Sequence, residues 1–250
     1  MKLEVAVLSD PGKVRPGNED AYGSFAPAGG REQRETGWLF VVADGMGGHQ
    51  GGEIASRLAV DAIHDSYFAD PDSDRGAVLV RAVKDANGLV LEQSQADSSL
   101  SGMGTTCTAM AIHDGRGFFI HIGDSRAYLL REGELVQLTN DHSLVGEMIR
   151  SGMITDEDAR NHPRRNVITR SLGVQEAVEA DTPHTPFELR RDDLFLLCSD
   201  GLSACVSDEE IRGVLAGKDL DSVAGALVEM ANARGGKDNV TVLLIRVRRV

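Results

Sequence analysis

Five acidic residues stand out because each one follows an apolar run or flanks a glycine-rich turn. They are Asp20 in RPGNED, Asp44 in WLFVVADGMGG, Asp124 in FFIHIGDSR, Asp200 in DLFLLCSDG and Asp238 in GGKDNVTVLLI. Carboxylates normally lie on solvated surfaces, where water stabilises their charge. Carboxylates that crowd at the rim of a core repel one another unless cations lie between them. The pattern therefore predicts a metal site.

Glycine follows two of these carboxylates, and each pair ends an apolar run that no partner strand directly follows. Gly45 comes after Asp44, and Gly201 comes after Asp200. A glycine lets backbone carbonyls approach a cation, which a β-carbon would hinder. The same dipeptide at Asp114 links two apolar runs, and we interpret it as a hairpin turn only. On spacing alone, turn or cap roles stay open for the other three carboxylates.

The cationic and histidine residues narrow the chemistry of the site. Arg15 belongs to the same RPGNED element as Asp20, and its planar fork is suited to bidentate phosphate binding. The 7 histidines show neither an HExxH pattern nor paired spacing with cysteines, so zinc is not predicted. Ligands that are all oxygen favour Mg²⁺ or Mn²⁺.

Composition limits the class of protein. The chain has 250 residues, of which 41% are hydrophobic and 26% charged, as in an ordinary globular domain. Its formal net charge of -13 argues against a general nucleic-acid binder. Three scattered cysteines indicate a reducing compartment, and we find neither a signal peptide nor a membrane span. We therefore expect a cytoplasmic protein.

Hydrophobic patterning indicates the elements that must position the acidic residues. Runs rich in β-branched or aromatic residues predict strands over 3–8, 38–43, 106–113, 117–123, 127–131, 135–138, 193–198 and 240–247. Helical periodicity appears over 53–67, 76–95 and 220–233. Asp114-Gly115 and Glu132-Gly133 predict hairpins, and hence antiparallel pairing. Antiparallel sheets with helices outside give an α+β layered sandwich.

The stretch 140–173 differs from the rest of the chain. It mixes short helical turns over 144–151 and 156–159 with histidines, arginines and a proline. Long irregular segments in compact domains are commonly lids or binding loops. We expect a functional flap over one edge of the sandwich.

Eight motifs, taken in order, carry a resemblance to a known family. They are RPGNED (15–20), ADGMGGHQGGE (43–53), GMGTT (102–106), HIGDSRAY (121–128), TNDHS (139–143), HPRRNVITRSLG (162–173), CSDGL (198–202) and KDNVT (237–241). Over essentially the whole chain they resemble the metal-dependent PPM, or PP2C-like, serine/threonine protein phosphatases of the small bacterial type. The resemblance implies a single catalytic domain over 1–250, with two antiparallel sheets flanked by helices on both sides and a flap at about 140–173.

The resemblance also implies roles for individual residues around two Mn²⁺ or Mg²⁺ ions. Asp44 would bridge both ions, and the carbonyl of Gly45 would bind the second. Asp200 and Asp238 would complete the shell of the first ion.

The remaining implied roles lie around these ligands. Glu19 and Asp20 would hold metal-bound waters, and Arg15 would bind the substrate phosphate. Asp124, together with Asp200, would form a third metal position. The flap would contribute His142, His162, Arg164 and Arg165.

One position departs from the family pattern. Animal members carry a histidine after the Asp-Gly pair as the proposed general acid, whereas this chain has Met46, which cannot donate a proton. The loss of a general acid is worth roughly 10²–10⁴ in rate. We assign no residue to this role and propose that a metal-bound water serves; His49 lies nearby in the sequence.

The leading hypothesis is a metal-dependent phosphatase that removes phosphate from serine and threonine in proteins and opposes a bacterial-type Ser/Thr kinase. Its partners would be phosphorylated proteins, among them the cognate kinase and its substrates, with no nucleic acid and no membrane, and the protein would be a monomer. Three alternatives are a non-catalytic phosphoprotein-binding module, a regulator phosphatase acting on an anti-sigma antagonist, and a small-molecule phosphatase. The retained acidic set and Arg15 favour the first hypothesis.

Overall fold

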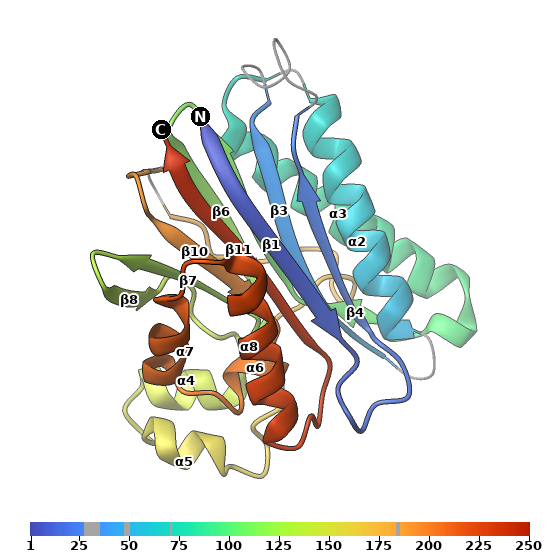
Figure 1. Cartoon of the computed structure of the whole chain (residues 1–250). Coiled ribbons are helices and arrows are strands. Elements are labelled where there is room, and N and C mark those ends of the chain that lie inside the picture. Colours follow the sequence, from blue (N-terminus) through green and yellow to red (C-terminus); the bar gives the residue numbers. More distant parts are fainter. Residues whose placement is uncertain (28–35, 48–50, 71, 184–185) are drawn as a thin grey trace.

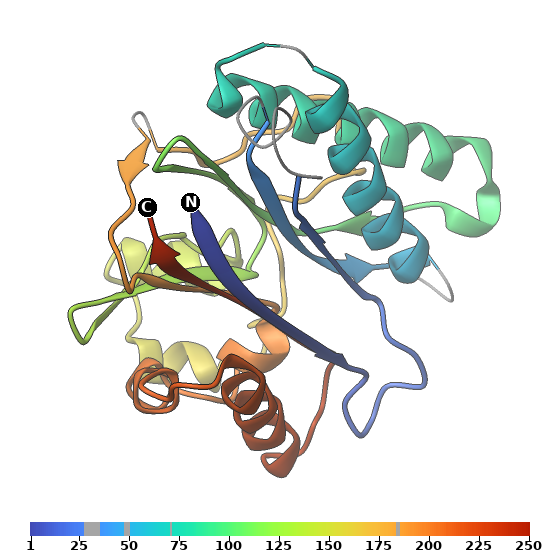
Figure 2. The same ribbon diagram turned by 45° about the horizontal axis from the view of Figure 1, so that its top comes forward.

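Two antiparallel β-sheets face each other, and helices cover the outer face of each sheet (Figures 1 and 2). The computed structural model describes residues 1–27, 36–47, 51–70, 72–183 and 186–250. This arrangement confirms the predicted α+β sandwich of two antiparallel sheets flanked by helices. Among the described residues, no helix is long and apolar enough to cross a membrane.

The first sheet contains both ends of the chain. Its strands, in spatial order, are β1 (Lys2–Asp10), β11 (Val240–Arg249), β10 (Leu194–Cys198), β7 (Arg126–Arg131) and β8 (Glu134–Gln137). The second sheet has the order β2 (Asp20–Phe25), β3 (Trp38–Met46), β5 (Cys107–His113), β6 (Arg116–Ile122) and β9 (Phe187–Glu188), and β4 (Gly104–Thr105) pairs with the end of β3.

The helices form two outer layers and a separate pair. The helices α2 (Gly51–Ala69) and α3 (Arg75–Ala96) cover the second sheet. The short 3-10 helix η1 (Ser98–Leu100) comes directly after α3 in the chain. The first sheet is covered by α6 (Asp200–Ser203), α7 (Asp208–Leu215) and α8 (Leu220–Ala233). The pair α4 (Leu144–Arg150) and α5 (Asp156–Arg160) lies beside α6 and α7 (Figure 1).

Strand alternation explains why the sandwich has three apolar layers. On β3, Phe40 and Val42 face the other sheet, where they meet residues such as Phe195 of β10. The alternate residues of β3, such as Leu39, pack instead against α2 and α3. Because both faces of the central strands are covered, these strands read as continuous apolar runs.

The sequence predicted most of these elements but missed one strand that borders the acidic site. The predicted strands and the three long helices are all present, and Asp114 and Glu132 open the predicted hairpins with positive φ angles of 48° and 54°. The sequence did not predict β2, whose run DAYGSF is short and contains a glycine. This strand begins at Asp20, one of the five acidic residues.

The packing between the sheets can be tested at Phe195, which is fully buried and whose ring lies 5.7 Å from that of Phe187. We predict that Phe195→Ala lowers the free energy of unfolding by about 3–5 kcal/mol, because it leaves a cavity between the sheets. Val136→Ala, on exposed β8 of the same sheet, is the control and should change it by less than about 0.5 kcal/mol. Equal losses in urea unfolding would contradict the packing account.

Candidate metal centre

The five acidic residues lie at one end of the sandwich, although they come from distant parts of the chain. Asp20 and Asp44 stand directly opposite each other in the register of β2 and β3. Asp200 begins α6 just after β10, and Asp238 lies just before β11. Asp124 follows β6 in the turn that leads into β7. The antiparallel sheets therefore bring all five carboxylates to the same end of the sandwich.

Burial and mutual repulsion raise the pKa values of carboxyl groups in this cluster. Desolvation first, and then repulsion from neighbouring carboxylates, hold the pKa of Asp44 well above its ordinary value of 3.8. The same desolvation raises the pKa of Asp20 to about 7 and that of Asp200 to about 6, although a hydrogen bond between Asp200 and Asp44 opposes the second shift. Asp44 and Asp200 keep some exposed surface as residues, but their carboxyl groups are crowded by protein atoms.

Two carboxylate oxygens in the cluster are buried without a hydrogen-bond partner. Asp20 accepts hydrogen bonds of 2.7 Å from the hydroxyls of Ser199 and Thr241, but both reach the same oxygen, Oδ2. Its Oδ1 is left unpaired, as is Oδ1 of Asp124. Unpaired buried anionic oxygens are costly. Their presence among other carboxylates fits hard divalent cations, which prefer oxygen ligands.

The carboxylates do not all converge on one point. Within the described residues, no three His, Cys, Asp or Glu side chains are arranged tightly enough to enclose an ion. Asp238 instead forms an ion pair of 2.8 Å with Arg15. The backbone nevertheless brings these side chains to one end of the sandwich, and carboxylate side chains rotate readily, so the shared repulsion and the orphaned oxygens still fit bound cations.

Glycine at position 45 has a packing reason that the sequence did not reveal. A β-carbon there would collide with the carbonyl oxygen of Gly52 at the start of α2 and with that of Glu19. The backbone N–H of Gly45 donates to the Glu19 carbonyl at 3.1 Å, so this strand end and the loop before β2 are held together. The carbonyl role of Gly45 toward a cation remains a prediction.

Asn239 holds the Arg15 loop, and sequence reasoning missed it. Its amide nitrogen donates to the carbonyls of Pro11 and Gly17 at 2.9 and 2.8 Å, and its side-chain oxygen accepts from the N–H of Glu19 at 2.8 Å. The one signal in the sequence was its position directly after Asp238, within the KDNVT motif. A buried amide with three backbone partners fixes the path of the whole loop.

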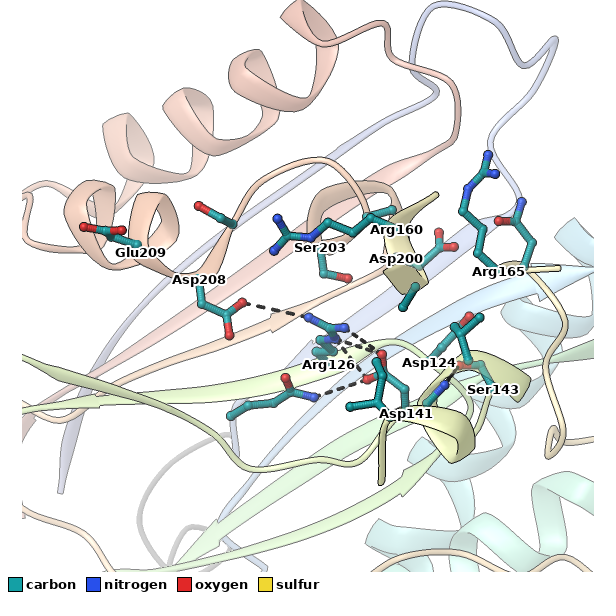
Figure 3. Close-up of a pocket in the computed structure, with 18 residues that line it drawn as sticks. Asp124, Arg126, Asp141, Ser143, Arg160, Arg165, Asp200, Ser203, Asp208 and Glu209 are labelled. Carbon is teal, nitrogen blue, oxygen red and sulfur yellow. Dashed lines mark hydrogen bonds and ion pairs between the residues drawn. The ribbon is translucent and has the colours of Figure 1, made fainter. Parts of the chain in front are cut away.

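The predicted flap residues occupy two different environments. His142 is buried: its ring accepts from the N–H of Gly123 and lies 3.3 Å from a carboxylate oxygen of Asp181. Arg165 is exposed and lines a cavity of about 390 Å³ between the flap, α6 and α7 (Figure 3). His162 and Arg164 do not line this cavity.

The floor of this cavity leads directly to the acidic cluster. Asp124 and Asp200 line it, and beside them Arg126 forms a 2.7 Å ion pair with Asp141 (Figure 3). Met46 ends β3 beside Gly104, and its thioether supplies no proton. His49 lies outside the described residues.

The raised pKa values predict how the melting temperature depends on pH when a chelator keeps the protein free of metal. In the folded protein the pKa of Asp20 is about 7 and that of Asp200 is about 6, whereas the ordinary value for both is 3.8. Between pH 3.8 and these raised values, the folded state therefore binds more protons than the unfolded state. The melting temperature should therefore fall as pH rises from about 4 to 7, by about 10 °C or more. Asp20→Asn should flatten this slope, and saturating Mn²⁺ should oppose it.

Exposed Asp61 on α2 provides the control for that measurement. Asp61→Asn should leave the pH slope unchanged. If the melting temperature of Asp20→Asn falls with pH as steeply as that of the unaltered protein, the proposed desolvation and repulsion at Asp20 are wrong.

Comparison with known proteins places this geometry in context. Residues 18–244 match the family model described as protein phosphatase 2C. The serine/threonine phosphatase stp of Listeria monocytogenes is 39% identical over 242 residues, which cover 95% of this chain and 93% of that protein. PstP of Mycobacterium tuberculosis is 42% identical over 245 residues, covering 98% of this chain and 45% of that protein.

A solved structure extends the similarity to three dimensions. The catalytic domain of the serine/threonine protein phosphatase PstP, in complex with two manganese ions, superposes with a TM-score of 0.85 at 41% identity. The match covers 99% of each chain.

Proposed function

The chain belongs to the protein phosphatase 2C family of serine/threonine phosphatases, and from this premise we propose that it hydrolyses phosphoserine and phosphothreonine in proteins with a metal-activated water. One observation carries the proposal: five carboxylates share one end of the sandwich with Arg15, which is the right charge pattern for cations and phosphate together. When bound, two divalent cations supply a deprotonated water as nucleophile and neutralise the phosphoryl oxygens.

We assign the cation ligands according to where the backbone places them. Asp44, between the other carboxylates, would bridge two Mn²⁺ or Mg²⁺ ions, with the carbonyl of Gly45 on the second. Asp200 and Asp238 would complete the first shell. Asp124 is set apart from the β2–β3 pair, and its unpaired Oδ1 is available to a third ion together with Asp200.

Glu19 and Asp20 would act through water. Asp20 is held rigidly by Ser199 and Thr241 through one oxygen, so its free Oδ1 is oriented to accept from a water of the cation shell. Burial raises the pKa of Glu19, and Arg15 opposes that shift, so this carboxylate also lies within the electrostatic field of the site. Both residues would hold and orient the nucleophile.

Arg15 would bind the phosphate of the substrate. Its guanidinium is partly exposed and pairs with Asp238, so it can reach a phosphate once that carboxylate binds a cation. The departing serine or threonine oxygen needs a proton that Met46 cannot give. We assign this role to a water of the cation shell.

The biological setting is also part of the proposal. Free cysteines and the absence of a membrane-spanning helix among the described residues are compatible with action in the cytoplasm. We propose a monomer with one catalytic domain over 1–250, a flap at about 140–173, and phosphoproteins as partners. A cognate Ser/Thr kinase and its substrates would be the proteins that it opposes.

The proposed ligands are tested with a phosphothreonine peptide and Mn²⁺. We predict that Asp200→Asn lowers kcat/KM by more than about 10²-fold, because even outer-shell partners of a metal are worth 10–100-fold. A chelator should abolish turnover of the unaltered protein. The control is Asp114→Asn, the same dipeptide in a hairpin turn, which should leave kcat/KM unchanged.

Two results would contradict the proposal in different ways. Turnover that survives in chelator would exclude metal-dependent hydrolysis. Tight phosphopeptide binding without turnover in the metal-loaded protein would favour the phosphoprotein-binding module instead.

Asn239 should act on the substrate phosphate through the Arg15 loop. We predict that Asn239→Ala raises KM more than it lowers kcat and reduces kcat/KM by up to about 10²-fold, since a small misplacement of a binding group is costly. In an Arg15→Ala background the same change should raise KM little further, because the phosphate-binding group is already absent. Additive effects of the two changes would show that Asn239 does not act through Arg15.

Asn87 is the matched control for this cycle. It is also buried and also bonds two carbonyls and one N–H, of Gln175, Glu176 and Gly173, but on α3. Asn87→Ala should lower stability by a similar amount, about 1–3 kcal/mol. Its effect on kcat/KM should not depend on Arg15.

A further inference from the structure

A second cleft opens from the acidic cluster on the side of α8, and its charge is opposite to that of the cluster. This α8-side cleft has a volume of about 300 Å³ and runs between the end of α5 and the end of α8. Its acidic lining residues are Asp200 and Asp238, both of which we assign to cations. Every other charged residue that lines it is basic: Arg160, Arg165, Arg234 and Lys237.

Three of these four cations are free to meet a ligand. Arg234 is neutralised by Glu210, with which it forms two hydrogen bonds. Among the described residues, Arg160, Arg165 and Lys237 make no ion pair, and all three are exposed. In a chain with 39 acidic and 26 basic residues, three unpaired cations in one cleft are unusual. They create a local positive field beside the site of phosphate binding.

The cavity on the other side of the flap provides a contrast. This α7-side cavity, described above, shares Arg160 and Arg165 but also contains Asp208 and Glu209 at the start of α7. Figure 3 shows Arg165 on one side of Asp200, and on the other side Asp208 together with the guanidinium groups of Arg160 and Arg126. The α7-side cavity therefore carries charges of both signs, whereas the acidic lining of the α8-side cleft consists of the two assigned cation ligands. The two directions in which a bound peptide can leave the centre are thus not equivalent.

We propose that the α8-side cleft binds a second anionic group of the substrate, a phosphate or a carboxylate, a short distance along the peptide from the phosphoresidue being hydrolysed. The inference rests on the proposed function and specifies its substrate class. Arg160 and Arg165 can each offer a planar fork to phosphate or carboxylate oxygens, and Lys237 adds a point charge from the opposite wall. Arg160 is a specificity residue here, because we assign it no role toward the reacting phosphate or the cations.

The test compares three peptides of the same neutral sequence in the Mn²⁺-loaded enzyme. The first peptide carries a single phosphothreonine. The second adds another phosphothreonine two residues away, and the third has glutamate at that added position. Each added group is placed in turn on the N-terminal and on the C-terminal side of the first phosphothreonine. We expect kcat/KM to be on the order of fivefold higher for a peptide with an added anionic group, on one side only. If kcat/KM rises only for the peptide with the second phosphothreonine, the cleft binds phosphate. If it rises for the glutamate peptide as well, the cleft binds carboxylate too.

Arg160→Ala should remove this preference and leave the neutral peptide and a small aryl phosphate within about twofold of the unaltered enzyme. The preference should also weaken with added salt, because the cleft is open to solvent. Arg212→Ala is the control, since Arg212 is likewise an exposed arginine in the last turn of a short helix but lines neither cleft.

Different results would overturn different claims. Equal kcat/KM for all peptides, or a preference that survives in Arg160→Ala, would refute the second-anion cleft while leaving the phosphatase proposal intact. Failure to hydrolyse any phosphopeptide with Mn²⁺ would instead contradict the proposed function, and the inference with it.

Discussion

The repulsion among five carboxylates at one end of the sandwich is the constraint on which the rest of the structure depends. Burial limits the solvation of four of them, and this desolvation raises the pKa values of Asp20, Asp44, Asp124 and Asp200. Divalent cations relieve this cost directly. The register that places Asp20 opposite Asp44 and the two hydroxyls that hold Asp20 by one oxygen are therefore parts of one electrostatic arrangement.

Different elements around this centre would bind the phosphate and the rest of the phosphoprotein. Asn239 ties the loop of Arg15 to the strand that follows Asp238, so a phosphate-binding group and a cation ligand are fixed by one side chain. The flap borders the centre from the other side and lines both the basic α8-side cleft and the α7-side cavity, whose lining carries charges of both signs. On this account, chemistry depends on the strand ends and substrate choice depends on the flap.

The sequence predicted the strands, the three long helices and the five acidic positions, because apolar runs and glycine turns are local signals. It could not predict β2, whose short run becomes a strand only when it pairs with β3. Asn239 was missed for a similar reason, since it bonds Gly17, 222 positions away. His142, grouped with the flap from its position in the chain, is a buried residue behind Gly123. Contacts of this kind are decided by packing and leave no local pattern.

The central claim is that the carboxylate cluster binds two cations that share Asp44. Anomalous diffraction at the manganese edge, from crystals soaked in Mn²⁺, tests this claim most directly. The account predicts two peaks roughly 4 Å apart, with Asp44 between them and with Asp200 and Asp238 around the first. No peak within the cluster, or peaks that lie away from Asp44, would contradict it.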